Sequence, residues 1–168
     1  MFLRPPKPDP ASPGQESVWD YPRPAVAEMT SKTLEVHFDG KCLAKTKNGV
    51  RTLETSHPPT YYFPPDDIDM TMLVQVAGQS LCEWKGQASY YDVVSKNGKR
   101  AARSAWTYRR PTAPFEILKG FIAFMPGEMD KCIVDGEIAR PQEGGFYGGW
   151  ITSDLAGPFK GPPGTRGW

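Results

Sequence analysis

The segment Leu34–Leu43, LEVHFDGKCL, alternates apolar and polar residues and reaches a turn at Asp39-Gly40. An alternation with a period of two is typical of a half-buried β-strand, and Asp-Gly favours a two-residue hairpin turn. The segment therefore predicts two antiparallel strands. Because His37 alternates with the apolar residues, we expect it on the opposite face, in a structural role.

Two more dipeptides of this kind, Asn97-Gly98 and Asp135-Gly136, separate apolar or aromatic segments. Three such hairpins predict a mainly β protein with an antiparallel core. A two-residue turn at Asn97-Gly98 would also place Asp92 directly opposite Arg103, so we expect these two charges to pair across the strands.

Helical patterns in the chain are short. The acidic segment PPDD, residues 64–67, is followed by an apolar stretch up to Leu73, which predicts a capped helical turn or two. Phe115–Gly120 predicts another turn, closed by Gly120. The expected fold is therefore one β domain with one or two short helical turns.

Composition divides the chain into three segments. Residues 1–30 contain seven of the eighteen prolines and few aliphatic residues, which predicts an extended N-terminal arm. Residues 31–140 hold the predicted strands and form the core domain. Residues 141–168 are rich in glycine, proline and aromatic residues, and we expect this tail to pack on the core.

Charge and cysteine usage restrict the environment and the partners. The formal charge of +1 favours neither nucleic acid nor acidic membranes as a partner, and no apolar run reaches the length of a membrane span. The three cysteines, Cys42, Cys82 and Cys132, are widely spaced, and the N-terminus has no secretory pattern. These features predict a soluble cytoplasmic protein.

The first candidate site is the segment around Glu54 and His57. Pro58 restricts His57 to extended geometry, so the imidazole can be held in one place. A carboxylate beside an imidazole stabilises the imidazolium and fixes its tautomer, which suits proton transfer. The alternative is a histidine that only ties down its loop. Tyr61 and Tyr62 follow closely as candidate ligand contacts.

The second candidate site lies at Cys82-Glu83-Trp84-Lys85-Gly86. An ammonium near Cys82 would favour the thiolate that a nucleophile needs, but a free cysteine is also often buried and inert. Lys85 is the better candidate, as a contact for an anionic group. Tyr90 follows as a further ligand contact.

Trp106 and Tyr108 complete the candidate ligand contacts, at the end of a basic stretch that runs from Lys96 to Arg110. Aromatic residues among cations can bind nucleic acid, but a solvated hairpin explains the stretch more simply.

Asp67 and Asp69 have the spacing of a magnesium-binding pair, and a helix cap is again the simpler account. No zinc-binding spacing and no phosphate-binding glycine motif occurs, so the sequence predicts no metal site and no cofactor.

A series of motifs resembles one known family, the small bacterial and fungal proteins of domain of unknown function 427. The resemblance covers Leu34 to Arg140, and the C-terminal segment is similar to a longer-tailed subset. The motifs, in chain order, are Glu54-x-x-His57-Pro58 with Tyr61-Tyr62-Phe63-Pro64, Cys82-x-x-Lys85-Gly86-x-Ala88-x-Tyr90, Ala105-Trp106-x-Tyr108, Gly120-Phe121-Ile122-Ala123-Phe124 and Val134-Asp135-Gly136.

This resemblance implies a compact, strongly twisted, barrel- or tent-like β domain around an aromatic-lined pocket. The family carries a nucleotidyltransferase label, which this chain supports poorly because no Gly-Ser dipeptide precedes an Asp-x-Asp pair. Two departures from the family pattern bear on what the pocket accepts. Glu83-Trp84 replaces a common Pro-aromatic pair, and Arg109-Arg110 separates Tyr108 from Pro111.

Three functions follow as hypotheses. The first is a pocket that binds a small, anionic molecule and acts on it through Glu54, His57 and Cys82. The second is a magnesium-dependent nucleotidyltransferase that uses Asp67 and Asp69. The third is a non-catalytic interaction module whose tail docks a partner or a second copy of the chain.

Overall fold

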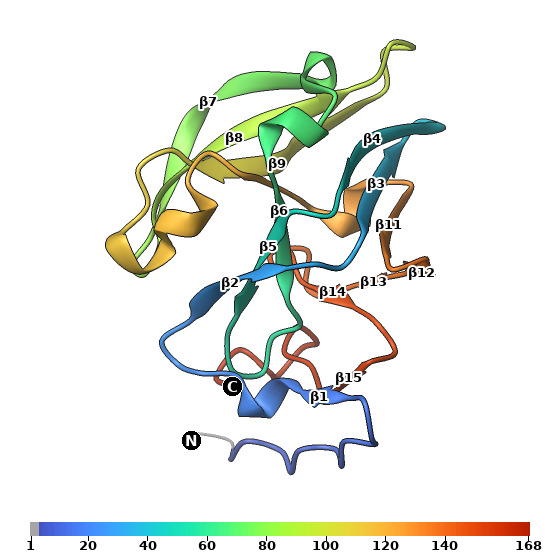
Figure 1. The fold of residues 1–168 in the computed structure, drawn as a ribbon. Coiled ribbons are helices and arrows are strands. Elements are labelled where there is room, and N and C mark those ends of the chain that lie inside the picture. The colour runs from blue at the N-terminus through green and yellow to red at the C-terminus, as the bar shows by residue number, and fades with distance from the viewer. Residues whose placement is uncertain (1–3) are drawn as a thin grey trace.

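The computed structural model describes residues 4–168, and it confirms a mainly β protein. Residues 1–3 of the predicted arm lie outside the described residues. The largest sheet has seven strands, in the spatial order β2 (Val26–Thr30), β5 (Gly49–Leu53), β6 (Thr60–Phe63), β10 (Ile122–Phe124), β9 (Arg100–Tyr108), β8 (Gly86–Val94) and β7 (Leu73–Cys82). Figure 1 shows β7, β8 and β9 together at one end of the molecule.

A second sheet of four strands carries the opening hairpin. Its order is β12 (Glu137–Ile138), β11 (Lys131–Val134), β3 (Leu34–Phe38) and β4 (Lys41–Thr46). Two short pairs complete the strands: β1 (Glu16–Ser17) with β15 (Leu155–Ala156), and β13 (Arg140–Pro141) with β14 (Trp150–Ile151). Within the described residues every sheet remains open at its edges, so the barrel form that the resemblance allowed is not adopted.

The helical elements are short 3-10 turns, as expected. They are η1 (Val18–Asp20), η2 (Pro65–Asp67), η3 (Met70–Met72), η4 (Ala113–Leu118) and η5 (Pro126–Glu128). The acidic cap lies one turn later than predicted, because Asp69 accepts the Thr71 N–H at the start of η3. The segment after η3 is strand β7, which the sequence did not predict. It is an edge strand exposed on both faces, so its apolar alternation is weak.

Two of the three predicted hairpins form as expected. Asp39-Gly40 joins β3 to β4, and Asp135-Gly136 joins β11 to β12. At each turn both residues have positive φ, which is the requirement of a two-residue hairpin of the favoured type.

The Asn97-Gly98 hairpin joins β8 to β9 by a longer loop than predicted. Val94 pairs with Arg100, so residues 95–99 form the connection, and the register shifts near Asp92. The predicted side-chain pair is therefore wrong. Asp92 Oδ1 accepts the backbone N–H of Arg103 at 2.8 Å, and Asp92 Oδ2 accepts from Arg100 Nη1 at 2.5 Å.

The main hydrophobic core contains residues of both larger sheets. Leu34, Val36 and Phe38 of β3 are fully buried there, as their alternation predicts. Trp150 of the C-terminal segment also belongs to this core and is fully buried. A second core covers the opposite face of the seven-stranded sheet, where η4 packs with Phe115 and Leu118.

The two terminal segments lie side by side at the other end of the molecule (Figure 1), because β1 pairs with β15 in parallel. The N-terminal segment also contributes strand β2, which pairs with β5. No helix among residues 4–168 is long and apolar enough to cross a membrane.

Candidate functional site

A hollow of about 470 Å³ opens on the seven-stranded sheet, on the face of Tyr62 and away from the main core. Its volume is in the range of small-molecule sites. The residues that line it are Glu54, His57, Thr60, Tyr62, Ser80, Leu81, Cys82, Lys85, Tyr90, Arg103, Trp106, Tyr108, Met125, Gln142, Phe146, Tyr147, Gly148 and Lys160.

The aromatic wall follows one row of the strand ladder. Tyr62 pairs with Ala123, Ala123 with Trp106, and Trp106 with Tyr90. Directly paired residues point to the same face of a sheet, so three rings lie in a line with the small Ala123 between the first two. Burial raises the pKa of Tyr62 and of Tyr108, which keeps both phenols protonated at neutral pH. The wall is thus flat, largely apolar and uncharged.

Eight of the nine predicted site residues line this hollow. They are Glu54, His57, Tyr62, Cys82, Lys85, Tyr90, Trp106 and Tyr108. Tyr61 lies elsewhere: it is buried in the main core, with its ring 5.0 Å from that of Trp150. Because successive strand residues point to opposite faces, only one member of the Tyr61-Tyr62 pair can reach the hollow.

The side chains of Glu54 and His57 are in contact in the loop between β5 and β6. His57 Nε2 lies 3.2 Å from Glu54 Oε2, and a backbone hydrogen bond from His57 N to Glu54 O closes the turn between them. Ser56, at the third position of this turn, has a φ of 73°. The turn points both side chains into the hollow.

Gln142 fixes the tautomer of His57. Its Oε1 accepts the N–H of Gly149, and its Nε2 donates to the carbonyl of Lys160, so the amide has one orientation. The same Nε2 lies 3.1 Å from His57 Nδ1, and an amide nitrogen can only donate. His57 Nδ1 must therefore accept, and Nε2 carries the proton that faces Glu54.

Glu54 is the member of this pair with a free oxygen. Among the described residues its Oε2 contacts His57, while Oε1 makes no hydrogen bond. Burial alone would raise the pKa of Glu54, but the hydrogen bond from His57, with the charges of Lys85 and Arg23, lowers it below its ordinary value. Glu54 is consequently an ionised acceptor at neutral pH.

Three cations line the hollow together with this single carboxylate: Lys85, Arg103 and Lys160. Lys85 is in the turn between β7 and β8, and the Arg103 guanidinium lies 4.2 Å above the Tyr90 ring. Burial, together with the charge of Arg23, lowers the pKa of Lys160, against the opposing effect of Glu54. The hollow thus has a formal excess of positive charge.

The C-terminal segment closes one side of the hollow with Phe146, Tyr147, Gly148 and Lys160. The Tyr147 ring meets the His57 ring edge-on at 5.1 Å. A Cβ added to Gly148 would lie 2.5 Å from the Trp106 ring, so only glycine permits this close approach. Gln142, Tyr147 and Lys160 were not predicted as site residues, because nothing in their local sequence indicates the contact.

Cys82 ends β7 and pairs with Gly86 across the turn. Its side chain is partly buried and makes no hydrogen bond or ion pair with any residue from 4 to 168. No base is positioned to activate the thiol. The geometry therefore favours Cys82 as part of the wall.

The carboxylates of Asp67 and Asp69 do not line the hollow. Asp67 Oδ2 accepts from the Thr46 hydroxyl at 2.6 Å, and Asp69 Oδ1 accepts from both the hydroxyl and the N–H of Thr71. Each carboxylate thus has its own local partner.

Comparison with known proteins gives a family match. A family model described as "Domain of unknown function (DUF427)", with the short name NTP_transf_9, matches residues 26–135. No curated protein matches the chain. The matched region includes the aromatic wall, Glu54, His57 and Lys85, and it ends before Gln142, Tyr147 and Lys160.

Proposed function

Because the chain belongs to the DUF427 family, whose description states no activity, we propose its function from the hollow itself: it binds a small organic anion and moves a proton on it. The observation that carries this proposal is the charge pattern. Lys85, Arg103 and Lys160 line the hollow with one carboxylate, Glu54, which already has His57 as its partner. Lys160 Nζ donates to Trp168 O and Arg103 Nη1 to the Ala77 carbonyl, whereas among the described residues the Lys85 side chain makes no hydrogen bond or ion pair and is available to an anionic ligand.

The aromatic wall defines the rest of the ligand. A planar or apolar group packs against the aromatic wall, next to the Arg103 guanidinium that covers the Tyr90 ring, while the anionic group meets the cations. Tyr62 and Tyr108, which remain protonated, supply hydroxyl groups that can donate to ligand oxygens. The ligand is therefore a small anion with an apolar, ring-like body.

Glu54 is the proton acceptor in this proposal. Its free Oε1 takes a proton from the ligand, and the electron pair left on the ligand is stabilised by Lys85 and Lys160. His57 donates from Nε2 to Oε2 and keeps the carboxylate oriented. In the reverse direction the protonated Glu54 returns the proton.

The binding step is tested by thermal shift with a panel of small carboxylates and phosphate esters. A ligand at 100 times its Kd stabilises the wild type by about 2.7 kcal/mol. We expect this shift to vanish in Lys85→Gln and to persist in Lys119→Gln, an exposed lysine outside the hollow. A ligand shift equal in both variants, or no shift from any anion, contradicts the proposal.

The proton-transfer step is tested on the ligand so found. We expect the wild type to exchange a ligand proton for deuterium in D₂O, followed by NMR. Glu54→Gln should bind the ligand and not exchange it, because the amide cannot take the proton. Exchange at the wild-type rate in this variant would exclude Glu54 as the acceptor.

Magnesium-dependent nucleotidyl transfer is the alternative that the family's short name suggests. Calorimetric titration of nucleoside triphosphates with and without magnesium distinguishes it from anion binding in the hollow. Binding that requires magnesium and is lost in Asp67→Asn would favour the alternative. Binding that is lost only in Lys85→Gln would favour the hollow.

A further inference from the structure

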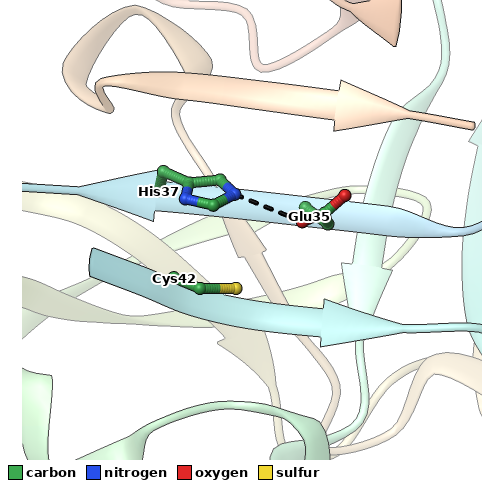
Figure 2. A group of neighbouring side chains, drawn as sticks. All are labelled: Glu35, His37 and Cys42. Carbon is green, nitrogen blue, oxygen red and sulfur yellow. Dashed lines mark hydrogen bonds and ion pairs between the residues drawn. The ribbon is translucent and has the colours of Figure 1, made fainter. Parts of the chain in front are cut away.

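A separate group of donor atoms lies on the β3–β4 hairpin. Glu35 and His37 come from β3 and Cys42 from β4, and Figure 2 shows the three side chains close together over the two strands. One carboxylate oxygen, one imidazole nitrogen and the thiol sulfur all lie within 4.8 Å of one another. None of the three residues lines the hollow.

The hairpin itself builds this group. His37 and Cys42 are direct partners in the ladder, and Glu35 lies two residues before His37 on the same strand. Residues two apart on a strand share a face, and direct partners face each other across it. The Asp39-Gly40 turn thus brings a thiol to an imidazole without any metal-binding spacing in the sequence.

We propose that Glu35, His37 and Cys42 bind a zinc-class transition metal ion. Zinc bond lengths of about 2.0–2.3 Å in a tetrahedral site place donor atoms about 3.3–3.8 Å apart. His37 Nε2 and Glu35 Oε1 are already 3.3 Å apart. From a separation of 4.8 Å the thiol would have to approach them by about 1 Å to reach this spacing.

The donor set also selects the kind of ion. A thiolate and an imidazole prefer zinc, cobalt or copper, whereas magnesium and calcium prefer oxygen donors. The ionised thiolate and carboxylate would neutralise a divalent ion. Three protein donors leave one tetrahedral position for water, and the site is accessible because the Glu35 and His37 side chains are 20% and 22% exposed and Cys42 is exposed.

The neighbouring charges leave the donors available. Lys45 is the ladder partner of Glu35 and Lys131 that of His37, yet neither lysine forms an ion pair with Glu35 in the part of the chain from residue 4 onward. The weak Cys42 contact to the Ala44 carbonyl, at 3.5 Å, is readily given up. A metal ion would replace only the Glu35–His37 contact.

Cobalt titration of the full, untagged chain tests the proposal. We expect one equivalent of Co²⁺ to produce a thiolate-to-cobalt absorption band that Zn²⁺ displaces. Cys42→Ser should lose the band, and His37→Ala and Glu35→Gln should each weaken Zn²⁺ binding. Because these are direct ligands, the loss should exceed the roughly 10–100-fold change caused by removing an outer-sphere partner.

Cys82→Ser is the matched control, since Cys82 is another free thiol and lines the hollow, away from the β3–β4 hairpin. Its cobalt band should equal that of the wild type. Absence of a band in the wild type would overturn the proposal. So would a band that survives in folded Cys42→Ser and disappears in Cys82→Ser, because the metal would then be bound in the hollow.

Discussion

At the scale of single residues, Glu54 and His57 differ in how many of their polar atoms already have a partner. Both nitrogens of His57 are engaged, one by Gln142 and one by Glu54, while one oxygen of Glu54 is free. The histidine was predicted as one half of a proton-transfer pair. In the function proposed above, it positions Glu54, and the carboxylate with its free oxygen is the group that meets the ligand.

The lowered pKa of Glu54 has a consequence for stability. A carboxyl group whose pKa falls on folding stabilises the native state above its ordinary pKa of 4.5, and this contribution is lost as the pH falls through the lower native value. We expect Glu54→Gln to lower the free energy of unfolding by about 0.5–1.5 kcal/mol at pH 7. The difference from wild type should shrink as the pH falls below 4.5.

Urea denaturation at a series of pH values measures this difference. Glu116→Gln is the control, because Glu116 is 64% exposed and its Lys119 partner is 3.9 Å away. The control should change stability little at any pH. A Glu54→Gln difference that grew toward low pH would contradict the assigned direction of the shift.

At the scale of elements, Asp92 fixes the irregular pairing of β8 with β9. Its carboxylate accepts the backbone N–H of Arg103 at the register shift, and this leaves the Arg103 side chain to lie over Tyr90 at the hollow. The side-chain partner of Asp92 is Arg100, which is half exposed. The backbone bond, and not the ion pair, therefore holds the bend.

Two variants separate these contributions. Asp92→Ala leaves the Arg103 N–H without its partner, and we expect a loss of about 1–3 kcal/mol. Arg100→Ala removes an ion pair whose Arg100 side is half exposed and leaves the buried Asp92 carboxylate bonded to the Arg103 N–H, for an expected loss of about 0–1 kcal/mol. Thermal or chemical unfolding gives both values, and equal losses would show that the ion pair dominates.

At the scale of the whole molecule, the C-terminal segment completes both the main core and the hollow. Trp150 is fully buried beside Tyr61 and Phe63, and Tyr147, Gly148 and Lys160 line the hollow. This placement bears on the hypothesis of a docking tail. A segment that fills the core is poorly suited to leave it for a partner.

Truncation and substitution test this role of the segment. We expect Trp150→Ala to cost about 3–5 kcal/mol, as large-to-small core substitutions do. Trp150→Phe should cost much less, because it keeps a ring and removes an indole N–H that has no partner.

A chain that ends at residue 143 should lose its cooperative unfolding transition, measured by circular dichroism. A truncated chain that stays folded and only loses self-association would instead support the docking tail.

The alternation in Leu34–Phe38 and the two-residue turns at Asp39-Gly40 and Asp135-Gly136 were sufficient to predict the β class and two hairpins, because these features depend on local backbone preference. Residue chemistry and the family resemblance identified eight of the eighteen residues around the hollow as candidates for a site. They could not decide between Tyr61 and Tyr62, because the face that a strand residue occupies depends on what the sheet packs against.

Contacts between distant segments were decided only by the tertiary structure. Gln142 meets His57 across 85 residues, and Lys160 reaches the same hollow from the end of the chain. The ladder pairing that brings Cys42 to His37 also depends on the register of the hairpin. By itself the sequence determined the β class, two of the hairpins and the supply of reactive side chains. Which of those side chains meet was set by packing and register, since these are properties of the folded chain as a whole.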